Sequence, residues 1–157
     1  ILADDIDATA TIIEEAIGWH ETARASHQGL LRLRYSAPDP AQAGTYLDVL
    51  KLPDAEPGEL GTGSIHHIAF RAADDITQGQ LGAQLTRAGL DVTQQRDRTY
   101  FRSIYAREPS GLLIEIATDA PGFLVDEDEE ALGMRLQLPK ALEAQRSEIE
   151  ENLPELY

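Results

Sequence analysis

The chain has 157 residues, with 28 acidic and 13 basic side chains, a formal net charge of -15, and no cysteine. This composition excludes a disulfide scaffold, a cysteine nucleophile and a thiolate metal site, and it argues against nucleic acid or an anionic membrane as partner, because both need clustered Lys and Arg. With 42% hydrophobic residues and no apolar run long enough to span a bilayer, we expect a folded cytoplasmic protein.

A first structural module is predicted over residues 1–52. Apolar residues at helical spacing predict a helix whose apolar face is Ile6, Ala10, Ile13 and Ile17. Asp4 or Asp5 suits the N-cap of this helix, and Gly18 suits its C-terminal end. Alternating segments predict strands over residues 19–25, 30–36 and 45–52. Residues 1–3 resemble a shortened first strand, and because the chain opens without Met, we expect its natural N-terminus to lie upstream.

A second module is predicted over residues 64–118, because the sequence repeats itself. Ala-Asp-Asp-Ile occurs at residues 3–6 and again at 73–76, where it opens a second helix that ends near Gly89 and is capped by Asp74 or Asp75. The expected apolar face of this helix is Ile76, Leu81, Leu85 and Ala88, and the expected strands are residues 65–72, 91–95, 100–107 and 112–118.

Each module therefore reads strand–helix–strand–strand–strand. This predicts an α+β fold of two βαβββ modules, with curved mixed sheets around a cleft and the helices outside. Residues 53–63, rich in Pro and Gly, are the predicted linker. Residues 119–157 are expected to form a C-terminal helical arm over the sheet, with a break at residues 120–122 and a helix over residues 139–152.

Two residues of the second module are candidate metal ligands. Strand alternation places His67 and Glu115 on the face opposite the apolar pairs that would pack on the helix. A carboxylate among apolar neighbours is costly to bury unless it is paired or bound to metal. His and Glu are two members of the two-His-one-carboxylate set that binds non-heme iron(II). The plainer alternative is that Glu115 pairs with a nearby arginine and that His67 bonds to the backbone.

Three more residues could complete a site around this pair. Tyr105 offers a phenol, Arg98 a guanidinium that steadies negative charge, and His66 a proton carrier near neutral pH. The alternative interpretation gives all three ordinary surface or turn positions.

Three segments together carry a family resemblance: residues 63–71 (GSIHHIAFR), 97–105 (DRTYFRSIY) and 107–123 (REPSGLLIEIATDAPGF). They resemble the ring-cleaving dioxygenases of the hydroquinone type. These enzymes belong to the vicinal oxygen chelate superfamily, which also contains glyoxalase I and the bleomycin-resistance proteins. The resemblance covers nearly the whole chain and is densest over residues 58–123.

The resemblance implies four βαβββ modules, of which this chain matches the third and fourth, so we expect a C-terminal half. It implies that His67 and Glu115 bind iron(II), with Mn, Zn or Ni as possible replacements, and that His66, Arg98 and Tyr105 contact the ligands or the substrate. The implied partners are a small aromatic substrate and O₂. The third ligand would come from the missing N-terminal modules or a homodimer partner.

The sequence departs from this pattern in the first module and at one position of the second. His20 and His27 do not correspond to the missing third ligand. Asp48 matches Glu115 within the repeat, but its module lacks the accompanying His. Ala106 stands where the family pattern has Phe.

Two other functions stay open on the same fold. One is a glyoxalase-like isomerase that uses zinc or nickel. The other is a metal-free module that binds a small molecule such as a drug.

Overall fold

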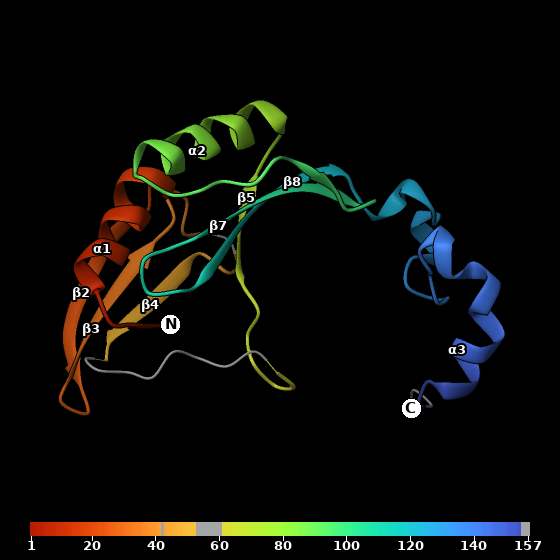
Figure 1. Ribbon diagram of the computed structural model, residues 1–157, viewed down its shortest axis with the longest axis horizontal. Helices are drawn as coiled ribbons and strands as arrows, with labels where there is room; N and C mark the ends of the chain where they lie inside the picture. The colour runs from red at the N-terminus through yellow and green to blue at the C-terminus, as the bar shows by residue number, and fades with distance from the viewer. Residues whose placement is uncertain (42, 53–60, 155–157) are drawn as a thin grey trace. The chain divides into compact units, whose positions relative to one another are not determined.

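The computed structural model describes residues 1–41, 43–52 and 61–154. Its first compact unit, Ile1–Gly122, contains two four-stranded mixed sheets (Figure 1). The first has the order β1-β4-β3-β2 and the second β5-β8-β7-β6, so each has one parallel pair followed by antiparallel pairs. The strands are β1 (Leu2–Ala3), β2 (His20–His27), β3 (Leu30–Ser36), β4 (Tyr46–Lys51), β5 (Ile68–Ala72), β6 (Arg96–Asp97), β7 (Phe101–Arg107) and β8 (Leu113–Pro121). The predicted α+β duplication is confirmed.

The first helix joins the two modules. It consists of α1 (Ile6–Thr11) and the π-helical turn η1 (Ile12–Ile17), begins at the Asp5 cap and ends at Gly18 with φ 83°. A left-handed backbone conformation at this position favours glycine. The wide apolar face of the helix packs on two sides. Ile6 and Ile13 lie in the core of the first sheet, whereas Ile12, Ala16 and Ile17 pack with apolar residues of the second module.

The second helix, α2 (Asp75–Arg87), lies beside η1 and is capped by Asp74, whose carboxylate accepts a 2.7 Å bond from the Thr77 amide. The predicted apolar face is confirmed at Leu85, which is fully buried, but it is wrong at Ile76, which is 75% exposed, and at the exposed Ala88. Beside Leu85, the buried residues of the helix are Gln78 and Gly82. Apolar spacing in the sequence cannot predict a buried glutamine, because its burial depends on hydrogen-bond partners elsewhere in the chain.

The strand predictions need three corrections in the second module. Residues 91–95 form no strand beyond an isolated bridge at Val92. His66 and His67 precede β5 rather than lie within it. The strand expected to end at Thr118 continues as β8 to Pro121, which pairs with Phe101. Pro lacks a backbone N–H, and Pro121 tolerates that loss because β8 has only β7 as a neighbour there, its pairing with β5 having ended at Thr118. The predicted linker over residues 53–60 lies outside the described residues.

A buried polar contact also ties the modules together. The Thr9 hydroxyl on α1 donates a 2.7 Å hydrogen bond to the Glu108 carboxylate, beyond the end of β7. The Leu112 amide donates to the other oxygen of Glu108 at 2.8 Å. Thr9 and Glu108 are 1% and 3% exposed. Polar groups at such depth need partners, so this contact fixes the first helix against the β7–β8 turn.

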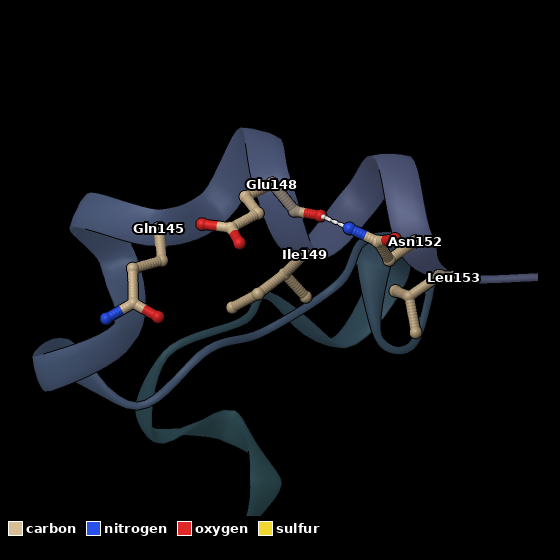
Figure 2. Close-up of a pocket in the computed structure, with 5 residues that line it drawn as sticks. All are labelled: Gln145, Glu148, Ile149, Asn152 and Leu153. Carbon is tan, nitrogen blue, oxygen red and sulfur yellow. Dashed lines mark hydrogen bonds between the residues drawn. The ribbon is translucent and has the colours of Figure 1, made fainter.

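The second unit, Phe123–Tyr157, contains four short helical segments in its described part: η2 (Phe123–Val125), η3 (Glu129–Ala131), η4 (Lys140–Gln145) and α3 (Arg146–Asn152). The helix expected from residue 139 is therefore a 3₁₀ segment followed by a short α-helix. Figure 2 shows a shallow pocket along α3, into which Ile149 and Leu153 project, while the Asn152 amide donates to the Glu148 carbonyl. No helix among the described residues has the length and apolar character to cross a membrane.

Candidate metal and substrate site

The register of the second sheet places Glu115 at the centre of a polar cluster. Glu115 on β8 lies opposite Tyr105 on β7 and opposite Ala69 on β5. Its neighbours Ile114 and Ile116 are buried in the core on the other face of the strand, as alternation predicts. The Glu115 side chain is nevertheless only 4% exposed. A carboxylate held at such depth needs compensation for the water it has lost.

The two oxygens of Glu115 have different partners. Oε1 accepts a 2.7 Å hydrogen bond from the Tyr105 hydroxyl. Oε2 lies 2.7 Å from Nε2 of His67, which reaches it from the segment just before β5. The tyrosine thus fixes the orientation of the carboxylate and leaves its second oxygen facing the imidazole.

The remaining candidates surround this pair. The Arg98 Nε donates to the Tyr105 hydroxyl at 3.2 Å, and its guanidinium lies 5.4 Å from the centre of the Tyr105 ring. The Nδ1 atoms of His66 and His67 are 2.9 Å apart. The structure therefore brings all five predicted residues into one hydrogen-bonded network: His66, His67, Arg98, Tyr105 and Glu115.

The sequence interpretation missed one member of this network. Ser103 is fully buried, and its hydroxyl lies 2.9 Å from the Tyr105 hydroxyl. Because that phenol gives its proton to Glu115, Ser103 acts as the donor to it. The available signal was strand alternation, which puts Ser103 and Tyr105 on the same face of β7.

The structure does not have the arrangement of the plainer alternative, in which Glu115 pairs with an arginine and His67 bonds to the backbone. Within the described part of the chain, Glu115 has no arginine partner, and His67 contacts a carboxylate rather than a backbone group. The charge of Glu115 is therefore buried beside neutral donors, unless His67 is protonated. A cation bound there would offset that burial.

The first module shows the opposite arrangement at the matching position. Asp48 on β4 lies opposite Arg34 on β3, as Glu115 lies opposite Tyr105. Arg34 donates two bonds to Asp48, at 2.7 and 2.8 Å, and Arg32 also binds this carboxylate. These hydrogen bonds hold the pKa of Asp48 well below its ordinary value. Two arginines neutralise Asp48, so this carboxylate lacks the surroundings that make Glu115 a candidate metal ligand.

We expect Asp48→Asn to lower the free energy of unfolding at neutral pH by about 0.5–1 kcal/mol, because these side chains are partly exposed. The folded-state pKa of Asp48 lies below the unfolded one, so its stabilising effect is present above about pH 4 and is lost as the pH falls further. Urea unfolding at pH 7 and pH 3 measures this. A difference between variant and wild type that stays constant with pH would contradict it.

The donor set suits a divalent first-row metal ion in part. One imidazole nitrogen and one carboxylate oxygen face each other across 2.7 Å, and each has a further partner that orients it, as metal ligands usually have. The described residues contain no group of three or more His, Asp or Glu that could hold a metal. His20 and His27 lie on β2 of the first sheet. The described residues thus bring together two candidate donors, His67 and Glu115.

Comparison with known proteins decides the family. Residues 1–116 match the family model described as the glyoxalase/bleomycin resistance protein/dioxygenase superfamily. The chain belongs to this superfamily. Within it, the chain is similar to a Bacillus subtilis (strain 168) protein named "Putative ring-cleaving dioxygenase MhqO", with 40% identity over 98% of this chain and 47% of that protein.

Two further proteins are similar to this chain. The chlorohydroquinone/hydroquinone 1,2-dioxygenase of Sphingobium indicum is 38% identical over 68% of this chain and 34% of its own length. A crystal structure of a "putative dioxygenase" from B. subtilis has a TM-score of 0.84 and 36% identity, and the match covers 100% of this chain and 48% of that one. The chain thus spans about half the length, or less, of these relatives.

Proposed function

We propose that this chain is part of an iron(II)-dependent ring-cleaving dioxygenase that acts on hydroquinone- or catechol-like aromatics, and that His67 and Glu115 are two of its metal ligands. The observation that carries this proposal is the buried Glu115 carboxylate, whose second oxygen, Oε2, faces Nε2 of His67 at 2.7 Å with no arginine or lysine partner in the described part of the chain. The names of the relatives support the reaction class and the kind of substrate.

A bound iron(II) ion would supply a Lewis-acidic centre with open positions for an aromatic oxygen and O₂. The third protein ligand would come from the rest of a longer protein or from a second copy of the chain. The relatives, which are about twice as long, favour the first source.

The chain's own residues would then orient the ligands and handle protons. The Tyr105 hydroxyl holds Oε1 of Glu115, which leaves Oε2 facing Nε2 of His67, where the two would hold the metal ion. Arg98 places positive charge beside that phenol, where it would steady negative charge on the substrate. The contact between the Nδ1 atoms of His66 and His67 gives a proton a path away from the site, or toward it.

Oxygen uptake tests this proposal. The protein used in this and the later experiments is the full-length protein that contains this chain. It is loaded with iron(II) under anaerobic conditions and mixed with O₂ and a panel of hydroquinones and catechols. Ring cleavage breaks one carbon–carbon bond and places both atoms of O₂ in the product, so no other oxidant or reductant is needed. We expect substrate and O₂ to be consumed in equal amounts, with loss of aromatic absorbance and a product that contains both oxygen atoms.

Two results would contradict the proposal. One is the absence of uptake across the whole panel. The other is uptake that yields a quinone and hydrogen peroxide, because that product pair shows oxidation without ring cleavage. Protein without iron, and free iron(II) without protein, are the controls.

A further inference from the structure

Gln78 on α2 is a polar side chain at the centre of the second module that the proposed function does not use. It is 1% exposed. Its amide nitrogen donates hydrogen bonds of 2.8 Å to two backbone carbonyls, those of Arg102 on β7 and Ile116 on β8. Its amide oxygen accepts a 2.7 Å bond from Gln95. Every donor and acceptor of this side chain is thus engaged, and two of its bonds link neighbouring strands.

The two strands are irregular where Gln78 binds them. Their pairing passes from Ser103 opposite Ala117 to Phe101 opposite Pro121, so two steps along β7 match four along β8. At this β-bulge the Arg102 amide donates to the Thr118 hydroxyl at 2.9 Å. Side chains of Thr118 and Gln78 therefore satisfy both backbone groups of Arg102, and these bonds stabilise the bulge.

The bulge lies next to the candidate site. Ile116 follows Glu115 directly, and Arg102 precedes Ser103, whose hydroxyl bonds to Tyr105. A shift of one residue in strand pairing would turn every side chain to the other face. The regular pairing of Ser103–Arg107 with Leu113–Ala117 ends at this bulge, and it includes Tyr105 opposite Glu115. By binding the carbonyls of Arg102 and Ile116, Gln78 holds the two strands together at the end of that regular stretch.

We propose that Gln78 is a positioning residue of this site: it fixes the β7–β8 register and so brings the Tyr105 hydroxyl to the Glu115 carboxylate. This inference rests on the proposed function for its catalytic meaning, but the positioning itself concerns residues of this chain alone.

The repeat offers a matched control. Thr9 stands four residues after its helix cap, Asp5, as Gln78 stands four after Asp74. Both side chains are 1% exposed. Thr9, however, bonds to Glu108 at the contact between the modules and not to a carbonyl beside Glu115. Loss of either polar group should lower stability, but only the loss of Gln78 should disturb the site.

The experiment compares wild type with Gln78→Met, Thr118→Val and Thr9→Val. Methionine has about the size of glutamine but cannot donate the two hydrogen bonds of Gln78. Thr118→Val removes the hydroxyl that binds the Arg102 amide at the same bulge, and it serves as the second variant in case Gln78→Met does not fold. One readout is the NMR signal of the Tyr105 ring in tyrosine-labelled protein, assigned by its loss in Tyr105→Phe. The others are the cobalt(II) absorption spectrum and affinity, and kcat and KM for oxygen uptake.

We expect Gln78→Met and Thr118→Val to shift the Tyr105 signal, alter the cobalt spectrum and weaken cobalt affinity about tenfold. We also expect kcat to fall by a larger factor than that by which KM changes. Thr9→Val should melt at a lower temperature with the Tyr105 signal and cobalt spectrum of wild type. The inference is overturned if both bulge variants are merely less stable, like Thr9→Val, and keep the wild-type Tyr105 signal. If wild type itself binds no metal and consumes no O₂, the proposed function fails, while the Tyr105 signal still decides the positioning.

Discussion

Glu115→Gln is expected to lower kcat/KM for oxygen uptake by at least a hundredfold. The amide keeps the size of the side chain and can still accept the Tyr105 hydrogen bond, but it has no negative charge for a divalent cation. Loss of a group that only supports a metal ligand costs about 10–100-fold, so loss of the ligand itself should cost more. Initial rates of O₂ consumption at saturating iron(II) measure the effect.

Asp48→Asn is the control for this variant, because it makes the same chemical change at the matching position of the first module. Its carboxylate binds Arg32 and Arg34 rather than facing a histidine, so the rate should stay within about twofold of wild type. Glu115→Gln protein with wild-type kcat/KM would contradict the role given to Glu115.

Tyr105→Phe is expected to lower kcat by about a hundredfold, a typical effect of removing a positioned proton-transfer group. The change also removes the bond that orients Glu115 and leaves the Ser103 hydroxyl without its acceptor. KM should change much less, because the ring stays and keeps its contact with the Arg98 guanidinium, although the hydrogen bond from Arg98 Nε to the hydroxyl is lost. Steady-state oxygen uptake over a range of substrate concentrations separates the two parameters.

Tyr46→Phe provides the comparison for that variant. Tyr46 lies on β4 of the first sheet and is 58% exposed, so the loss of its hydroxyl should leave kcat unchanged. Equal kcat values for Tyr105→Phe and wild type would show that the phenol at position 105 takes no part in the reaction.

The sequence was sufficient to predict the architecture because its two copies carry the same local patterns. The helix caps at Asp5 and Asp74 and the left-handed Gly18 are where capping preferences place them. The exposed Ile76 could not be foreseen, because an apolar residue at helical spacing looks the same whether it faces the core or solvent. What decides its position is the bonding of Gln78 to two strands distant in sequence.

The candidate site was predictable where it depends on alternation and less so where it depends on register. Glu115 stood out as an acid between buried isoleucines, and the structure buries it as expected. His67 was expected within a strand but reaches Glu115 from the segment before β5. The contribution of Ser103 depends on its distance from the Tyr105 hydroxyl. Such distances depend on side-chain conformation and strand pairing, which no local sequence pattern specifies.

The most direct test of the account is anaerobic iron(II) binding by the full-length protein, measured by titration on wild type, His67→Ala, Glu115→Ala and the Asp48→Asn control. We predict that wild type and the control bind iron(II) with the same affinity and that both alanine variants lose this binding. The account would be contradicted if wild type bound no iron(II), or if both alanine variants bound it as wild type does.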